Sequence, residues 1–235
     1  MCGRYRLTAK ERYIAEHLDL QEEEVRWPPR YNIAPTQQVA VVRCDVRGPR
    51  RGFSLMRWGL IPSWAKDSSI AAGTINAMSE TAAQKPAFRD SLRTRRCLLP
   101  ADGFYEWKKL GPRARQPYNF GLKDDGLFAL AGLWDRWRAP SGELLETCTI
   151  LTTAANPLTG EVHDRMPVIL RPEDYDLWLD PGMTNPSAVQ RLLRPFEAGA
   201  MRKYPVTSRV GNPAFDNPEC AREAHPVETS DPMLF

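Results

Sequence analysis

The most reactive groups of the chain stand at its very start. Cys2 directly follows Met1, and a residue as small as cysteine in this position is typical of chains from which the methionine is removed. The mature Cys2 would carry an α-amine with a pKa of about 7.7 to 8.0 and a thiol with a pKa of about 8.5, so both groups are partly unprotonated near neutral pH. Such an amine can form an imine with an aldehyde, and the thiol can then close a thiazolidine ring on the imine carbon. Alternatively, Cys2 is only a small residue in a frayed terminus.

Two titratable side chains further along the chain have surroundings that suit proton transfer. Glu106 lies within the aromatic run Phe104-Tyr105-Glu106-Trp107. A carboxyl group surrounded by rings is desolvated, which raises its pKa toward neutrality, although an outward-facing glutamate on an alternating strand is the alternative. His163, one of three histidines, lies in a polar cluster before an apolar run. It is therefore either a surface turn residue or a placed acid/base group.

Tryptophans and arginines are the residues most relevant to nucleic-acid binding. We assign Trp58 to the core, whereas Trp64 is either a core residue or an exposed ring that can stack on bases. The basic connection at residues 47–51 is either a solvated loop or a nucleic-acid contact. The arginine-rich segment 86–96 is expected to form a helix with a solvated face.

Length and composition favour one globular domain. The chain has 235 residues, of which 42% are hydrophobic, and this is enough for a substantial core. We expect a single domain over residues 1–210, followed by a flexible tail over residues 211–235 that contains prolines but no apolar periodicity. The net charge of +3 is only mildly basic, so it neither favours nor excludes nucleic acid as a partner.

Membrane proteins and disulfide-rich scaffolds are disfavoured by the sequence. The chain has no apolar run near the roughly 20 residues that a membrane span needs, and its first residues lack a signal-peptide pattern. We therefore expect a soluble cytoplasmic protein, associated with the nucleoid if bacterial. The five cysteines lack paired close spacing, which excludes a zinc ribbon. Cys97 and Cys148 are expected in the core, and we expect neither a metal nor a cofactor.

The pattern of short apolar runs predicts an α+β fold, with a mixed, barrel-like β core and peripheral short helices. Thr8 and Glu11 form a capping-box pattern before a helix at residues 9–18. The proline-rich stretch 27–35 is expected to be an ordered loop. Further helices are expected at 86–96, 172–179 and 187–193, and strands at 38–43, 52–58, 96–100, 103–109, 117–123, 127–134, 147–153 and 202–206.

Six short motifs occur in order along the chain. They are Cys2-Gly3-Arg4-Tyr5, Tyr31-Asn32-Ile33-Ala34-Pro35, Trp58-Gly59-Leu60, Asn76-Ala77, Gly103-Phe104-Tyr105-Glu106-Trp107 and His163-Asp164-Arg165-Met166-Pro167. Each motif is weak alone, but six in order, starting at position 2, form a specific pattern. Together they resemble the SOS-response-associated peptidase (SRAP) family, which implies a single SRAP-like catalytic domain over residues 1–210.

The resemblance implies a covalent activity on damaged DNA. Members of this family link themselves to abasic sites in single-stranded DNA, because the N-terminal cysteine attacks the open-chain aldehyde of the deoxyribose and closes a thiazolidine. Cys2 matches that cysteine and Asn76 an asparagine that orients it. Glu106 matches a glutamate that shuttles protons, and His163 a histidine that assists ring opening and imine formation. The implied partner is single-stranded DNA containing abasic sites, bound by a monomer.

The resemblance also implies a set of DNA contacts. Arg4 and Arg165 match phosphate contacts, Asn32 belongs to the same DNA-binding set, and the Trp64 region matches an aromatic element that separates or stacks bases. This chain departs from the family at one position. An arginine often stands two residues after the asparagine, where Met78 stands here.

Two other functions are compatible with these residues. A cysteine with a histidine and an asparagine is also a thiol-hydrolase set, so Cys2 could act as a cysteine-type peptidase, for example in removing residues that precede it. A non-covalent single-strand binder would explain the arginines and tryptophans but would leave Glu106 and His163 without a role. Peptide cleavage without a DNA adduct would favour the peptidase, and a covalent adduct would favour the abasic-site activity.

Overall fold

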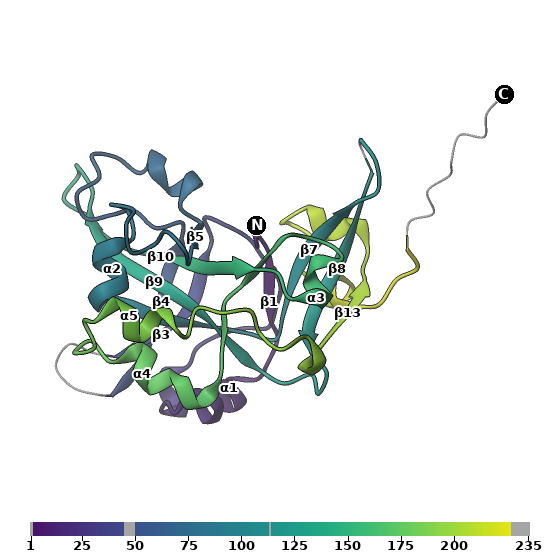
Figure 1. Cartoon of the computed structure of the whole chain (residues 1–235), viewed down its shortest axis with the longest axis horizontal. Helices are drawn as coiled ribbons and strands as arrows, with labels where there is room; N and C mark the ends of the chain where they lie inside the picture. Colours follow the sequence, from purple (N-terminus) through teal and green to yellow (C-terminus); the bar gives the residue numbers. More distant parts are fainter. Residues whose placement is uncertain (1, 45–49, 113, 227–235) are drawn as a thin grey trace.

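The computed structural model describes residues 2–44, 50–112 and 114–226 of the chain. At its centre, five strands pair in a closed circuit, since β10 pairs both with β4 and with β9 (Figure 1). A closed circuit has no unpaired edge strand. The expected barrel-like core is therefore confirmed. Its strands are β3 (Gln38–Cys44), β4 (Arg51–Trp58), β6 (Arg96–Ala101), β9 (Phe128–Arg138) and β10 (Leu144–Ala154).

Three short strands extend the barrel, and a second sheet packs beside it. The additions are β5 (Asn76–Met78) and β11 (Arg165–Pro167), which pair with β10, and β12 (Ile169–Leu170), which pairs with β9. The second sheet has the order β13-β8-β7-β1-β2. Its strands are β1 (Tyr5–Leu7), β2 (Arg30–Ile33), β7 (Gly103–Lys109), β8 (Arg115–Leu122) and β13 (Met201–Pro205).

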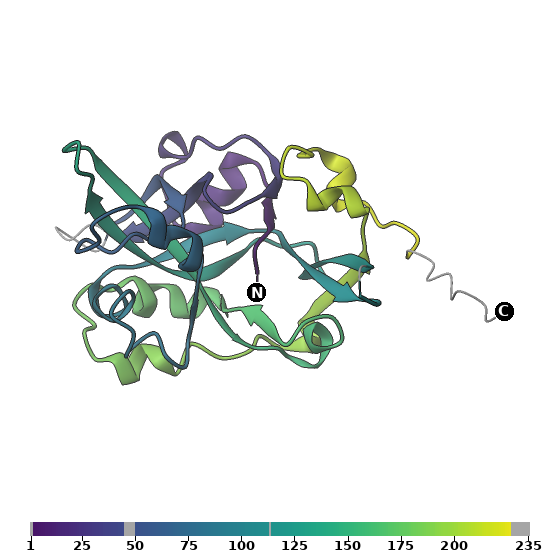
Figure 2. The same cartoon turned by 90° about the horizontal axis from the view of Figure 1, so that it is seen from above.

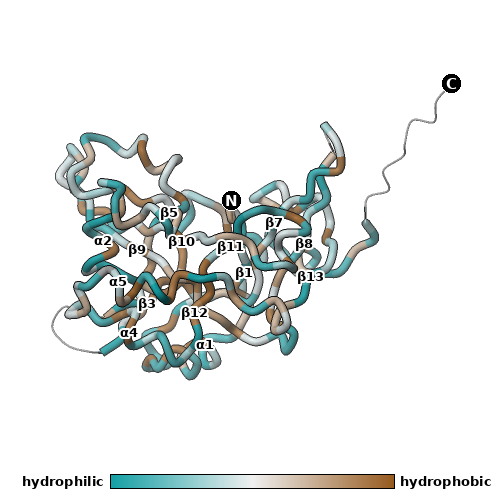
Figure 3. The backbone as a smooth tube through the Cα atoms, in the orientation of Figure 1, coloured by the Kyte–Doolittle hydropathy of each residue, from teal (hydrophilic) through white to brown (hydrophobic). Residues whose placement is uncertain are grey.

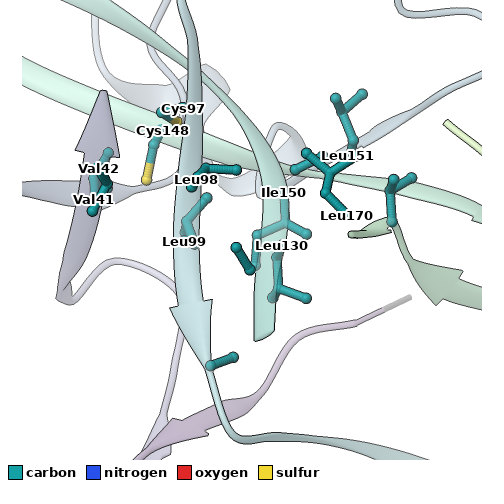
Figure 4. Packing of buried hydrophobic residues seen from close by; sticks show 14 of the residues in the cluster. Val41, Val42, Cys97, Leu98, Leu99, Leu130, Cys148, Ile150, Leu151 and Leu170 are labelled. Atoms are coloured by element: carbon teal, nitrogen blue, oxygen red, sulfur yellow. The ribbon is translucent and has the colours of Figure 1, made fainter. Parts of the chain in front are cut away.

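The barrel interior is closely packed with aliphatic side chains and two thiols (Figure 4). Cys97 and Cys148 are both fully buried there, as the sequence indicated. Gly132 of β9 faces the same region, and a Cβ at this position would lie only 2.9 Å from the Cys97 sulfur. The close approach of these strands therefore requires glycine at this position.

Short helices surround the β core. In Figure 3 the turns of α1 (Glu11–Leu18) alternate between hydrophilic and hydrophobic residues, as expected of a helix with one buried face. Among the described residues, no helix is long and apolar enough to cross a membrane. The remaining helical segments are η1 (Glu22–Glu24), η2 (Ser69–Gly73), α2 (Arg89–Thr94), α3 (Pro157–Gly160), η3 (Pro172–Asp174), α4 (Tyr175–Leu179), α5 (Pro186–Gln190), η4 (Ala198–Ala200), η5 (Ser208–Gly211) and η6 (Pro218–Ala221).

β1 brings the start of the chain to the middle of the molecule. It pairs antiparallel with β2 on one side and with β7 on the other, and Tyr5 lies opposite both Ile33 and Phe104. The backbone N–H of Tyr105 also donates to the carbonyl oxygen of Arg4 at 3.0 Å. This contact extends the pairing toward Cys2. Figure 1 shows β1 between the β5 and β10 side of the molecule and the β7 and β8 side.

Three predictions about local structure are wrong. Thr8 does not cap α1, because its hydroxyl and N–H both donate to the Asp102 carboxylate, and the N-cap position belongs to Lys10. The proline-rich stretch 27–35 contains strand β2, since its prolines lie outside residues 30–33. Arg96, expected on a solvated face, is buried, and its Nε donates to the Trp178 carbonyl oxygen at 2.6 Å.

The C-terminal segment is held to the rest of the protein as far as Ala224, whose N–H donates to the Pro205 carbonyl oxygen at 2.9 Å, which corrects the expectation that a flexible tail begins at residue 211. Cys220 is fully buried, and Asp216 accepts hydrogen bonds from the backbone N–H groups of Tyr31 at 2.6 Å and Asn32 at 2.9 Å. Asp216 also pairs with Arg30. Figure 2 shows this segment beside the early part of the chain. The rest of the predicted tail, residues 227–235, lies outside the described residues.

The basic connection at residues 47–51 is described only in part. Residues 47–49 of this predicted basic connection lie outside the described residues. Arg50 pairs with Glu24 at 2.5 Å and Arg51 pairs with Asp176 at 2.6 Å. The two described arginines therefore bind carboxylates of the protein itself.

Candidate active site

Cys2 is fixed in the interior by the strands on either side of it. Its side chain is fully buried, and its sulfur lies 3.8 Å from the carbonyl oxygen of Arg4. The Asn76 side chain donates from Nδ2 to the Cys2 carbonyl oxygen at 2.9 Å. Asn76 begins β5, where the parallel register with β10 places it opposite Ile150. The hydrogen bond from Asn76 goes to the backbone of Cys2, so it holds the residue in position without engaging the thiol.

Glu106 provides an ionisable group beside this cysteine. It lies on β7 and is only 3% exposed, so it does not face outward. Burial raises the pKa of Glu106 to about 7, and the nearby Asp164 carboxylate adds to the increase. The pKa of the Cys2 thiol is also raised, first by burial and then by the negative charge of Glu106. The two groups are therefore electrostatic neighbours, and near pH 7 Glu106 can both accept and release a proton.

His163 lies on the turn between α3 and β11. The backbone N–H of Arg165 donates to its Nδ1 at 3.0 Å, and an oxygen of Asp164 lies at the same distance from Nδ1. The Arg165 N–H fits a neutral ring whose Nδ1 accepts, whereas Asp164, which is 89% exposed, pairs with the ring only when Nδ1 is protonated. Burial lowers the pKa of His163. A neutral ring whose Nδ1 accepts a hydrogen bond carries its proton on Nε2.

Arg165 is held by two partners next to this turn. Nη1 and Nη2 donate to the two carboxylate oxygens of Glu80 at 2.7 and 2.9 Å. Nη2 also donates to the carbonyl oxygen of Thr152 on β10 at 2.7 Å. The pairing with Glu80 lowers the pKa of that carboxylate. Glu80 was missed in the sequence because its partner is 85 residues away, and only the fold brings the two together.

Arg4 and Asn32 form one structural unit with the C-terminal segment. Arg4 donates to the side-chain oxygen of Asn32 at 3.1 Å and to the carbonyl oxygens of Val210 and Gly211 at 2.8 and 3.1 Å. Asn32 is fully buried. Its Nδ2 donates to backbone carbonyl oxygens of residues 210, 212 and 215. In this structure Asn32 thus contacts protein rather than solvent, and it supports the position of Arg4.

Trp58 and Trp64 differ in burial, which agrees with the assignment of Trp58 to the core and with the exposed alternative for Trp64. Trp58 is fully buried, and its ring N–H donates to the Ile75 carbonyl oxygen at 2.8 Å. Trp64 is 57% exposed, so more than half of its surface is open to solvent. Met78, at the end of β5, is also exposed at 39%. The structure therefore brings Cys2, Asn76 and Glu106 together, with the turn of His163 and Arg165 beside them and Trp64 on the surface.

A buried cysteine at position 2 beside a carboxyl group of raised pKa, on a barrel with short peripheral helices, defines the class of protein to which the chain is compared. Residues 1–213 match the family model described as SOS response associated peptidase (SRAP). The chain belongs to this family, and the resemblance drawn from the six motifs is confirmed.

Individual relatives extend the match to most of the chain. The Abasic site processing protein YoqW of Bacillus subtilis (strain 168) is 44% identical over 221 residues, covering 93% of this chain and 98% of the relative. The mouse Abasic site processing protein HMCES is 31% identical over 243 residues, covering 88% of this chain and 68% of the relative. Among solved structures, a protein from Bacteroides thetaiotaomicron superposes with a TM-score of 0.85 at 27% identity, over 95% of this chain and all 100% of its own.

Proposed function

We propose that this chain processes abasic sites in single-stranded DNA, and that Cys2, after removal of Met1, forms a thiazolidine cross-link with the open-chain sugar. The observation that carries the proposal is the placement of Cys2 by Asn76 next to Glu106, whose pKa of about 7 suits proton transfer at physiological pH. The names of the relatives agree with this substrate, since YoqW and HMCES are both called abasic site processing proteins.

The proposed reaction loses one water and needs no other reactant. The Cys2 amine adds to the aldehyde carbon of the ring-opened deoxyribose, and water leaves to give an imine. The thiol sulfur then bonds to the imine carbon, and the thiol proton ends on the former imine nitrogen. Since burial and Glu106 raise the pKa of this thiol, the addition needs a proton acceptor. Glu106 takes the proton from sulfur and returns it to nitrogen. During ring opening, His163 donates its Nε2 proton to the sugar ring oxygen, the hydroxyl on the carbon that becomes the aldehyde loses its proton to water, and His163 regains a proton from water.

The DNA contacts in this proposal divide into direct and indirect ones. Arg165 binds a phosphate next to the lesion, and the exposed ring of Trp64 stacks on a base. Arg4 and Asn32 act indirectly, because Arg4 is already bonded to three acceptors and Asn32 is buried. Their contribution is to hold the strand that ends in Cys2.

The first prediction tests the thiazolidine. Wild-type protein mixed with an oligonucleotide containing one abasic site should gain the mass of the oligonucleotide minus one water. Cys2→Ser keeps the amine but lacks the sulfur, so it should give an imine that borohydride traps and no adduct that survives heating. Intact mass spectrometry measures both products.

Two controls make this result specific. Cys44→Ser removes a thiol on the distant strand β3 and should link as the wild type does. The N-terminal residue of the purified protein must also be determined, because the reaction requires Cys2 to carry the free amine. A heat-stable adduct from Cys2→Ser would exclude the thiazolidine, and peptide cleavage without an adduct would support a peptidase instead.

A further inference from the structure

The ion pair between Arg165 and Glu80 has the geometry of an arginine bound to a phosphate. Both terminal nitrogens of the guanidinium donate, one to each carboxylate oxygen, at 2.7 and 2.9 Å. Arginine binds two phosphate oxygens through the same parallel pair of N–H groups. While Glu80 is in place, the edge of Arg165 that would meet a phosphate is therefore occupied.

The two members of the pair differ in how firmly they are held. The Arg165 side chain is 14% exposed, and its Nη2 also donates to the Thr152 carbonyl oxygen at 2.7 Å. The Glu80 side chain is 47% exposed and lies just after β5. Ion pairs with a solvent-exposed member add little net stability, because water solvates the released carboxylate well. Glu80 can thus swing away, while Thr152 keeps Arg165 in place.

Thr152, on strand β10 of the barrel, contacts the backbone or side chain of both neighbouring segments and so brings Glu80 and Arg165 together. The Thr152 carbonyl oxygen accepts from the N–H of Ser79 at 2.9 Å as well as from Arg165. In the strand registers, Thr152 lies opposite Met78 of β5 and opposite Pro167 of β11. Residue 80 and residue 165 are therefore delivered by strands on either side of β10, and the pair lies beside the turn that carries His163.

We propose that Glu80 occupies the phosphate-binding edge of Arg165 in the free protein and must release it before Arg165 can bind a phosphate, so that this carboxylate sets the affinity for DNA and its salt dependence. The proposal rests on the proposed function, in which Arg165 meets a phosphate. While paired, the two side chains carry no net charge, and Arg165 displaces no counterion from DNA. Once Glu80 leaves, one further phosphate is neutralised. Met78, the last residue of β5, is uncharged and therefore does not replace the positive charge of Arg165 while that arginine is paired with Glu80.

Glu80→Gln tests this proposal, because it should raise the affinity for DNA, whereas a variant that damages the structure would lower it. Removing the competing charge should steepen the slope of log affinity against log salt by about 0.7 on single-stranded DNA, which is a gain of about eightfold in affinity near 50 mM salt that fades toward 1 M. The probe is an undamaged single-stranded oligonucleotide with a fluorescent end label, titrated with full-length protein at several salt concentrations. Glu80→Ala should change affinity in the same direction.

Two further variants show whether the gain passes through Arg165. Glu80→Gln should have no effect on affinity in an Arg165→Gln background. Glu16→Gln is the matched control, since it removes the same charge from an exposed pair with Arg12, at 2.9 Å on α1, on the opposite side of the molecule from β5 (Figure 1). It should leave the affinity near that of the wild type.

Several outcomes would overturn the proposal. Affinity that is unchanged or reduced in Glu80→Gln, with a normal melting temperature, would show that Glu80 does not compete with phosphate. An equal gain with Arg165 removed would show a general charge effect. If the wild type forms the abasic-site adduct but Glu80→Gln does not change the affinity for DNA, only this inference is refuted. If Glu80→Gln raises the affinity for DNA but the wild type forms no adduct, only the covalent function is refuted. If neither the wild type nor any variant binds DNA, both are refuted.

Discussion

The identity of a side chain and the position of its proton decide the chemistry at the scale of single residues. Glu106 was open to two interpretations in the sequence, as a desolvated acid or as an outward-facing strand residue. The structure buries it at 3% exposure beside Cys2. Sequence could show the aromatic neighbours on its own strand, but the charge of Asp164 that also raises its pKa comes from another part of the chain.

The second prediction concerns the proton carried by Glu106. Glu106→Gln keeps the size of the side chain but cannot exchange a proton, so cross-linking should slow by a factor on the order of 10² to 10⁴. Single-turnover kinetics with excess protein and an abasic-site oligonucleotide give the rate. Glu16→Gln is the control, because it makes the same chemical change at an exposed carboxylate on α1 and should leave the rate near that of the wild type. Wild-type speed in Glu106→Gln would make Glu106 a structural residue.

Glu106 should also make the free energy of unfolding depend on pH. Folding raises the pKa of Glu106 from an ordinary 4.5 to about 7, so between these pH values the folded state holds a proton that the unfolded chain has lost. Stability contributed in this way is present at low pH and is lost as pH rises to about 7. Urea unfolding at pH 5 and pH 8 should therefore show a smaller decrease for Glu106→Gln than for the wild type.

At the scale of elements, apolar periodicity was a good guide to strands and a poor guide to segments held by polar contacts. The hairpin of β3 and β4 and the strands β6 to β10 lie close to the expected residues. The C-terminal segment was missed because Asp216, Arg4 and Asn32 hold it through hydrogen bonds to backbone groups. Such contacts leave no repeating pattern in a sequence.

The third prediction follows from this segment. Asp216→Ala removes the acceptor for two backbone N–H groups and for Arg30, which should cost about 2 kcal/mol of unfolding free energy, since hydrogen bonds to a charged group are among the stronger ones. Urea denaturation measures the loss. Glu219→Ala is the matched control on the same segment, because its pair with Arg209 at 3.1 Å is exposed. Equal effects of the two variants would mean that Asp216 has no special role.

At the scale of the whole molecule, the closed barrel depends on how near its strands can approach each other. Fold class and the burial of Cys97 and Cys148 followed from the apolar runs. The closure of the barrel could not be predicted from the apolar runs, because it depends on the parallel pairing of β4 with β10, in which about 90 residues separate Arg57 from Thr147. A single sequence carries no local signal for such a pairing.

The fourth prediction tests this close packing. Gly132→Ala would place a methyl group 2.9 Å from the Cys97 sulfur and 3.1 Å from the Thr149 carbonyl oxygen, and overpacking of this kind costs about 1 to 3 kcal/mol. Gly52→Ala on β4 is the matched control, since nothing lies within 4 Å of its added Cβ. Thermal melts should show a lower midpoint for Gly132→Ala only. Equal midpoints would indicate that the barrel can expand locally.

The position of β1 has a consequence for the order in which the protein acquires its reactive centre during synthesis. Tyr5 leaves the ribosome 99 residues before its neighbour Phe104 on β7. Contacts so distant along the chain form late, because the intervening loop must close first. Throughout this interval the terminus is open to enzymes that trim nascent chains. Cys2 is therefore enclosed only after β7 has been synthesised and has paired with β1.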